Sequence, residues 1–356
     1  MRNFLIVLFL IPFIANAQQL GNSATQQIKW FKHLGTYYNM YIGNRMPFID
    51  VEVKGAGDYP LTGVFLVDYG TDVSVIDLKA FPGDSLRKSI NNQYLLSFVV
   101  NKDYKISYSN KCKIQSLGHI SANGIREAGI IGTDILSKMI VTLDYKNSRL
   151  YMALDSSSYC RRDSLLKYGL VPVSTKGYFL RNARAGDSNI PTIPVTIGDV
   201  KNSAQALAQI DPGYDDRCHL DGNFNTYYTH IVNINKLYLQ LLKRRGVAVN
   251  VDKKSYYTLG NVSGVPDTLY KCSFSKRYVF NIIGTKGEIV MPYGTDECHV
   301  FLKVNAPGGE IAGGITTLPF PAVQLGGSFL LDCDKVAFDP FRSLVWFQSK
   351  RSFKRK

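Results

Sequence analysis

Short runs in which apolar and polar residues alternate recur along most of the chain, and they predict β-strands. The alternation starts near Tyr37 and is clear in "MPFIDVEVKG" (46–55). It continues in "YLLSFVV" and "YKISYS", and the polar residues 101–103 between these two runs predict a hairpin tip. One longer segment, residues 230–246, has apolar residues at helical spacing and ends in basic residues. The pattern therefore predicts a mainly β protein with one long helix.

The pattern occurs twice. "IPTIPVTIGDV" (190–200) resembles the run at 46–55, and each is followed by a polar loop and an apolar strand that ends in Asp-x-Gly. These endings are Asp68-Tyr69-Gly70 and Asp211-Pro212-Gly213. A closing unit, "IGTDILSKMIVTLDYKNSRLYM" (131–152), aligns without a gap on "GGSFLLDCDKVAFDPFRSLVWF" (326–347). The shared positions are Gly132/Gly327, Leu136/Leu331, Val141/Val336, Asp144/Asp339 and Ser148/Ser343. The sequence thus predicts two related lobes, 28–152 and 188–348, joined by a polar connection, 153–187.

A lone Asp-x-Gly is usually a hairpin corner, but two such turns with the same closing unit indicate more. Together they resemble the pepsin and retropepsin superfamily of aspartic peptidases. In that superfamily each lobe supplies an apolar-Asp-Thr/Ser-Gly turn and an apolar-apolar-Gly segment behind it. The matching segments here are "FLVDYGTDVSVI" with residues 130–132, and "AQIDPGYDD" with residues 325–327. The resemblance implies a bilobal, mainly antiparallel β fold with a cleft between the lobes, and an endopeptidase whose catalytic residues are Asp68 and Asp211.

Paired carboxylates suit peptide hydrolysis because two that lie close together do not both ionise readily. The ionised one activates a water, and the protonated one polarises the peptide carbonyl. Gly70 and Gly213 allow the backbone to approach both carboxylates closely. The resemblance also implies a flap hairpin with a tyrosine, for which the candidates are Tyr104 and Tyr108 in the hairpin at 94–109.

The active-site turns depart from the family pattern. The second position, normally Thr or Ser, is Tyr69 in one turn and Pro212 in the other, so the hydroxyl grip that links the two loops in the family is missing. The fourth position is Thr71, which is able to hydrogen-bond its aspartate, and Tyr214, which is too bulky to do so. Replacing Tyr69 and Pro212 by Thr would restore the grip.

Two other functions stay open. The first is a peptide- or protein-binding module that keeps the cleft and has lost hydrolysis. The second, an extracellular β-rich adhesin or glycan binder, explains the 22 tyrosines and the net charge of +14 but not the duplicated turns. Much of the charge lies in Lys243–Arg245 and in a basic tail at 349–356, and no nucleic-acid motif accompanies it.

The N-terminus predicts export. Residues 1–17 have a positive start, an apolar run at 4–14 and Ala15-Asn16-Ala17, which together are typical of a cleaved signal peptide. Residues 18–27 are a polar lead-in, and the mature chain is expected to be a periplasmic or secreted monomer without a transmembrane segment. An even number of cysteines, six, suggests disulfides, particularly after residue 200. We expect no cofactor, and Cys218-His219 and Cys298-His299 lack the spacing of a metal site.

Overall fold

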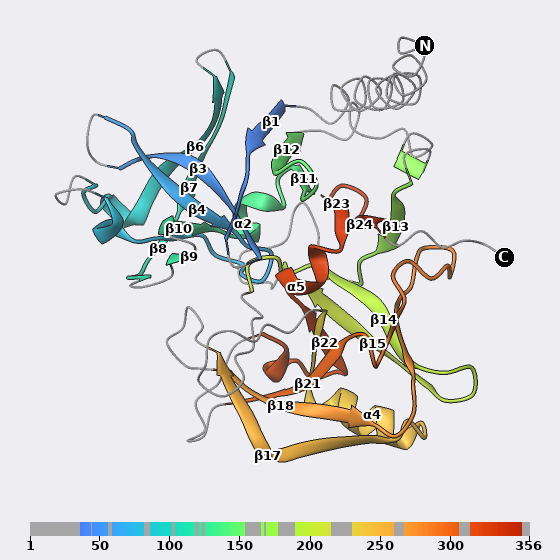
Figure 1. The fold of residues 1–356 in the computed structure, drawn as a ribbon. Helices are drawn as coiled ribbons and strands as arrows, with labels where there is room; N and C mark the ends of the chain where they lie inside the picture. The colour runs from blue at the N-terminus through green and yellow to red at the C-terminus, as the bar shows by residue number, and fades with distance from the viewer. Residues whose placement is uncertain are drawn as a thin grey trace, which may run out of the picture.

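The structure is a computed structural model that describes residues 36–350, except 44, 56–58, 82–85, 102–103, 118–120, 123–124, 154–164, 167–168, 177–188, 215–229, 260–266 and 306–313. Within these residues the strands form two nine-stranded sheets and one six-stranded sheet (Figure 1). One large sheet comes from the N-terminal half of the chain and the other from the C-terminal half. The mainly β fold with two lobes that the sequence predicts is confirmed.

In the N-terminal lobe the strand that leads to Asp68, β4 (Leu61–Val67), lies inside the sheet. The strand order is β7-β6-β3-β4-β10-β5-β8, with β2 paired to β3 and β9 paired to β10. β4 pairs antiparallel with β3 and parallel with β10, so both of its edges are covered. The predicted hairpin at 101–103 joins β6 and β7. The other bounds are β2 (Tyr41–Gly43), β3 (Met46–Lys54), β5 (Val75–Ile76), β6 (Gln93–Asn101), β7 (Tyr104–Lys111), β8 (Lys113–Ile114), β9 (Ser121–Ala122) and β10 (Ile125–Ile131).

The C-terminal lobe places the strand before Asp211, β15 (Ser203–Ile210), in an equivalent position. The order is β17-β18-β21-β16-β22-β15-β14-β19-β20. β15 pairs antiparallel with β14 and parallel with β22, which repeats the surroundings of β4. The other bounds are β14 (Thr192–Gly198), β16 (Ile231–Ile234), β17 (Val249–Leu259), β18 (Asp267–Phe274), β19 (Val279–Ile282), β20 (Tyr293–Gly294), β21 (His299–Val304) and β22 (Ala322–Leu325).

The six-stranded sheet joins the two lobes. Its order is β1-β12-β11-β23-β24-β13, with β1 (Thr36–Asn39), β11 (Ile140–Asp144), β12 (Arg149–Ala153), β13 (Val171–Ser174), β23 (Cys333–Asp339) and β24 (Leu344–Ser349). At its centre Val141 pairs with Phe338 and Leu143 pairs with Val336. Because Val141 corresponds to Val336 and Leu143 to Phe338 in the repeat, the two closing units meet as a two-fold pair. The predicted irregular connection contributes β13, whose apolar Val171 and Val173 pair with β24.

The closing units correspond as the repeat predicts, except at their start. Ser148 and Ser343 both have a positive φ, 51° and 53°, and so turn the chain alike. However, α2 (Thr133–Leu136) follows Gly132, whereas α5 (Gly327–Leu330) follows Gly326. The gapless alignment is therefore wrong by one residue there, and a β-bulge between Cys333 and Lys335 restores the register.

The helix predicted over 230–246 is shorter. Its first residues form strand β16, and α4 extends only over Lys236–Arg244. Asn235 sets the boundary, because its side chain accepts a hydrogen bond from the N–H of Tyr238 and caps the helix. The apolar residues of β16 and α4 pack on the same core, so the spacing that is typical of a helix extends through the strand.

Several predicted segments lie outside the described residues: the signal peptide at 1–17, the lead-in at 18–27, and all of the basic tail at 349–356 except its first two residues. Cys160 and Cys218 lie outside them as well. The described helices include none that is long and apolar enough to cross a bilayer. Cys112, Cys272 and Cys333 are buried free thiols, so the disulfides expected after residue 200 do not involve Cys272 or Cys333.

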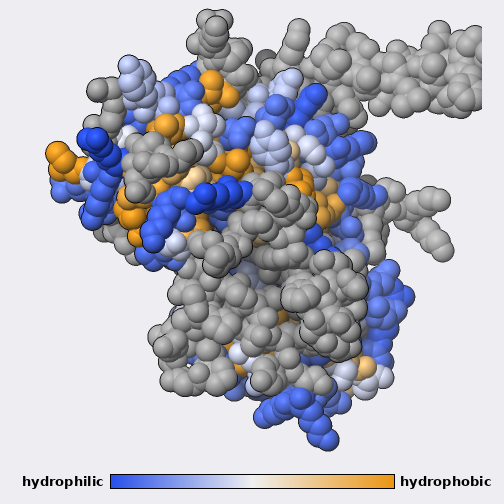
Figure 2. All heavy atoms as spheres, turned by 60° about the vertical axis from the view of Figure 1, so that its left-hand side comes forward, coloured by the Kyte–Doolittle hydropathy of each residue, from blue (hydrophilic) through white to orange (hydrophobic). Residues whose placement is uncertain are grey.

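The face in Figure 2 carries small hydrophobic patches among hydrophilic residues. The large apolar side chains that are most exposed, Tyr59, Ile90 and Val200, belong to separate elements. Isolated exposed side chains of this kind are ordinary on a protein surface.

Candidate active site

The two Asp-x-Gly turns leave their strands in the same way. The backbone N–H of Asp68 donates to the carbonyl of Ile131 at 3.0 Å, and that of Asp211 donates to the carbonyl of Leu325 at 2.9 Å. In each lobe the parallel neighbour, β10 or β22, thus holds the aspartate at the point where the strand ends. The sequence predicted this role for the segments before the closing glycines.

The turns meet crosswise, with each glycine against the aspartate of the other lobe. A Cβ atom placed on Gly213 would lie 2.5 Å from Cγ of Asp68, and one placed on Gly70 would overlap the carboxylate of Asp211. A side chain at either position would push the carboxylates apart. The structure therefore brings together the two aspartates that the sequence singles out, although 143 positions separate 68 from 211.

A methyl group at this contact should be harmful. We expect Gly70→Ala to lower any activity of the pair about 100-fold, because a shift of about 1 Å at reacting groups costs that much. The crowding should also lower the free energy of unfolding by about 1–3 kcal/mol. Denaturant unfolding and the assay described below would measure both effects. Unchanged activity in Gly70→Ala would show that the turns are farther apart than the structure has them.

The two carboxyl groups share a buried environment. Asp68 is 9% exposed and Asp211 is 6% exposed, and their side chains are hydrogen-bonded to each other. Burial, followed by the charge of Asp211 and the hydrogen bond to it, raises the pKa of Asp68 well above its usual range. The N–H of Gly70, 2.6 Å from Oδ1 of Asp68, opposes this shift. The pair thus keeps one proton at pH values where free carboxyl groups are ionised.

Glu127 on β10 is a third buried carboxyl group near the pair. It is buried, and burial together with the charge of Asp77 raises its pKa to about 8. When ionised, its charge also raises the pKa of Asp68. Glu127 therefore acts on Asp68 in the same direction as Asp211 does.

Asp211 is held by a side chain that the sequence did not single out. Nε2 of Gln324 donates to Oδ2 of Asp211 at 2.7 Å. Oε1 of Gln324 in turn accepts from Nζ of Lys303 at 2.9 Å. Lys303 and Gln324 are each 3% exposed. A buried ammonium therefore lies one amide group away from Asp211.

These groups belong to a polar row across one face of the C-terminal sheet. Gln324 is in register with Gln209 on one side and with Asn233 on the other. A Cβ atom on Gly314 would have Nζ of Lys303, Oε1 of Gln209 and Nε2 of Gln324 all within 4.0 Å. Buried polar side chains in a strand are uncommon, and here they gather beside Asp211.

The first turn is held by aromatic stacking. Tyr69 is fully buried, and its ring stacks on Phe338 of β23 with 3.7 Å between the ring centroids and 11° between the planes. The hydroxyl of Thr71 donates to the carbonyl of Val73 at 3.3 Å, so the expected bond from Thr71 to Asp68 is not what the structure shows. The carbonyl of Thr71 accepts instead from the N–H of Thr133 at 2.9 Å. Tyr69 therefore joins the turn to the strand that links the lobes.

The second turn uses its tyrosine differently. Pro212 has no N–H or hydroxyl to offer. Tyr214 is buried, and the Nζ atom of Lys303 lies 4.7 Å from the centroid of its ring, within the range of a cation–π contact. The carbonyl of Tyr214 accepts from the N–H of Gly327 at 3.5 Å. Tyr214 thus takes part in holding the lysine that supports Gln324.

None of the described contacts places the candidate flap tyrosines, Tyr104 and Tyr108, beside the two aspartates. Tyr108 on β7 lies with its ring centroid 5.4 Å from Nζ of Lys138, next to α2. The side chain of Tyr104 lies outside the described part of the chain. Their role as a flap stays a prediction.

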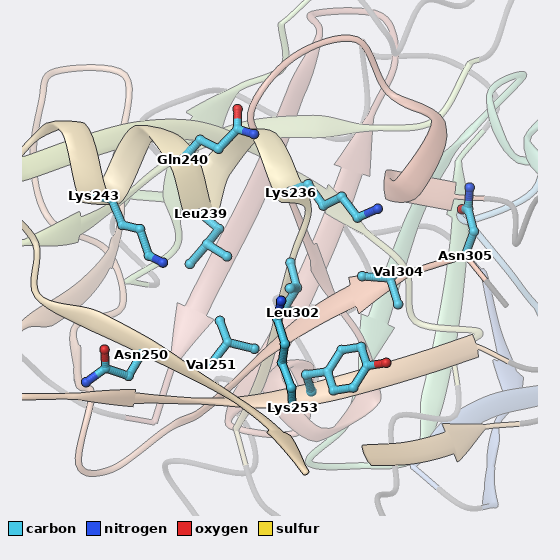
Figure 3. A pocket seen from close by; sticks show the side chains of 11 residues that line it. Lys236, Leu239, Gln240, Lys243, Asn250, Val251, Lys253, Leu302, Val304 and Asn305 are labelled. Carbon is cyan, nitrogen blue, oxygen red and sulfur yellow. The ribbon is translucent and has the colours of Figure 1, made fainter. Parts of the chain in front are cut away.

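A cavity of about 650 Å³ lies elsewhere, between α4 and strands β17, β18 and β21 (Figure 3). Leu302 and Val304 line it, whereas Lys303 between them belongs to the opposite face of β21. The cavity is therefore on the far side of the sheet from the aspartates. Its rim carries three lysines, Lys236, Lys243 and Lys253. Among the described residues no cluster of His, Cys, Asp and Glu has the arrangement of a metal site.

The sequence contains a weak indication that Gln324 and Lys303 take part in a buried polar contact. "AVQL" (322–325) interrupts an apolar strand with an amide, and "HVFLKV" (299–304) contains a lysine among apolar residues. A polar residue inside such a strand indicates a buried polar contact. The partner of that contact, Asp211, becomes visible only in the folded chain.

No protein-family model matches this chain, and no similar sequence is found among curated proteins. Among solved structures, basic 7S globulin from soybean is similar with 9% sequence identity and a TM-score of 0.44, over 89% of this chain and 95% of that chain. Similarity at this level carries no argument about the present protein, so the interpretation of the site depends on its own geometry.

Proposed function

We propose that this protein is an exported aspartic endopeptidase that hydrolyses peptide or protein substrates with Asp68 and Asp211. The observation that carries the proposal is the crosswise contact of the two turns, which holds two buried carboxyl groups hydrogen-bonded to each other. Structural aspartates are usually kept apart or paired with cations, because two adjacent carboxylates destabilise a fold. Export rests on the features of residues 1–17.

The arrangement supports general acid–base hydrolysis. Asp211 in its ionised form accepts a proton from a water molecule as the oxygen attacks the peptide carbonyl carbon. Asp68, which keeps its proton, donates it to the carbonyl oxygen. The tetrahedral intermediate then collapses: one of its hydroxyl groups returns a proton to Asp68 as the C=O bond re-forms, the C–N bond breaks, and the amine leaves with the proton that Asp211 took from the water. The two aspartates end with one proton between them, as they began.

The test is cleavage of a mixed pool of fluorescence-quenched peptides by the mature chain, starting at residue 18, from pH 3 to pH 8. We expect maximal activity on the acid side of neutral. At higher pH the activity should decline as Asp68 ionises. Because the pKa of Asp68 is raised above the ordinary aspartate value of about 3.9, this decline should occur at a higher pH than an ordinary aspartate would give. A rate that still rises at pH 8 would contradict a carboxyl pair.

The matched control is Asp72→Asn, because Asp72 is an exposed carboxylate close to the same turn. It should cleave like the unmodified protein, while Asp211→Asn should not cleave. If the unmodified protein binds peptides and cleaves none at any pH, the binding-module interpretation becomes the better one.

A further inference from the structure

Lys303 is a buried cation that is hydrogen-bonded to the amide that holds Asp211. Its side chain lies in a sheet at 3% exposure, with Gln324 at 2.9 Å and the ring of Tyr214 as its described contacts. An ammonium group loses much of its hydration when it is buried, so its remaining polar contacts matter. One of these contacts leads through the amide of Gln324 to the carboxylate of Asp211.

The lysine fixes which way the amide of Gln324 points. An ammonium group has only donors, so the oxygen of the amide must face it. The NH₂ group of Gln324 is then the end that faces Oδ2 of Asp211 at 2.7 Å. A carboxylate without a proton is an acceptor only, so an enforced donor at this distance favours the ionised form of Asp211.

On the basis of the proposed function, we propose that Lys303 is a positioning residue that, through Gln324, keeps Asp211 as the ionised member of the pair and leaves the shared proton on Asp68. The two effects of Lys303 act together: it orients the donor, and its positive charge favours the negative charge of Asp211. Lys303 and Gln324 thus hold the second turn from within its own lobe.

The other titratable groups around the pair agree with this asymmetry. Glu127 acts on Asp68 and disfavours a negative charge there. Tyr214 lies on the side of Lys303 and Asp211, where its ring contacts the ammonium. The buried cation thus lies on the side of Asp211, whereas on the side of Asp68 Glu127 disfavours a negative charge once it is itself ionised, above about pH 8.

The experiment is a pH titration of the aspartate carboxyl carbons by NMR in the mature protein labelled with ¹³C-aspartate. Asp68→Asn and Asp211→Asn assign the two signals. In the unmodified protein we expect Asp211 to ionise at the lower apparent pKa of the coupled pair and Asp68 at the higher one. The opposite order would overturn the proposal without any variant of Lys303.

Variants of Lys303 then separate charge from hydrogen bonding. Lys303→Gln can still donate to Oε1 of Gln324 but has no charge, and we expect it to raise the lower apparent pKa by about one unit, which is tenfold in proton affinity. Lys303→Arg keeps the charge and should stay near the unmodified value. If Lys303→Gln folds and the lower apparent pKa does not move, Lys303 has only a structural role.

Lys335→Gln is the control for loss of a buried lysine. Lys335 is 3% exposed and lies 3.4 Å from Asp144 in the six-stranded sheet. Its replacement should lower stability without moving the apparent pKa values of the pair. Since the titration needs no turnover, it stays decisive in a protein that cleaves no peptide. A shift with Lys303→Gln in an inactive protein would support the positioning role and contradict only the peptidase proposal.

Discussion

Asp68→Asn should abolish peptide cleavage and at the same time stabilise the protein at neutral pH. The loss of activity should be about 10²–10⁴-fold or more, because an amide cannot exchange a proton as the carboxyl group does. The gain in stability follows from the raised pKa of Asp68. When the pKa of a carboxyl group is higher in the folded than in the unfolded state, its contribution to stability is complete below the unfolded-state pKa. That contribution is lost as the pH rises through the folded-state pKa.

Asparagine has the shape of a protonated aspartate and never ionises. At pH 3, where the carboxyl group is protonated, Asp68→Asn should therefore unfold at nearly the same temperature as the unmodified protein. At pH 7 it should be more stable by ~1 kcal/mol, which corresponds to an increase in Tm of about 2 °C. Thermal unfolding at both pH values, together with the peptide assay, measures the two effects.

The exposed Asp72 again provides the control, since Asp72→Asn should leave both activity and Tm unchanged. A Tm at pH 7 that falls in Asp68→Asn would mean that ionised Asp68 is favourable where it lies. The two carboxyl groups would then not be held against each other.

The sequence was sufficient to predict the framework of the site. The strands that end at Asp68 and Asp211 are apolar and are followed by glycine, and each has a parallel neighbour that is also apolar, so local pattern and final position agree. The same holds for the closing units, whose central strands pair about a two-fold axis. A duplicated pattern predicts a duplicated structure because the same arrangement of apolar residues packs in the same way in both copies.

Apart from the aspartate pair, which the repeat indicated, side-chain contacts between distant segments were beyond this reasoning. Gln324 and Asp211 are separated by 113 positions, and no spacing rule connects them. The boundary between β16 and α4 was missed for a different reason: apolar residues of both elements face one core, and only the cap at Asn235 distinguishes them. The sequence also indicated that the grip between the two loops was missing, but not that Tyr69 stacks on Phe338 or that Gln324 holds Asp211.

Tyr69→Thr should be among the most destabilising single substitutions in this protein. The ring of Tyr69 is fully buried and stacked on Phe338, so threonine would leave the space of an aromatic ring empty at a junction between the lobes. We expect a loss of about 3–5 kcal/mol in the free energy of unfolding, measured by urea denaturation. Replacing Tyr69 and Pro212 together by threonine therefore does not restore the grip of the family cleanly, because it removes the contact that took its place.

Two further variants test whether the stacking itself matters. Tyr69→Phe keeps the ring and should retain most of the stability, whereas Tyr59→Thr, at a tyrosine that is 83% exposed, should change it by less than about 0.5 kcal/mol. In a double-mutant cycle, Tyr69→Thr and Phe338→Leu should show a coupling energy of about 0.5–1.5 kcal/mol. If Tyr69→Thr unfolds at the same urea concentration as the unmodified protein, the stack does not hold the first turn. Asp68 would then be held by its bonds to Ile131, Gly70 and Asp211 and by the contact of Gly213.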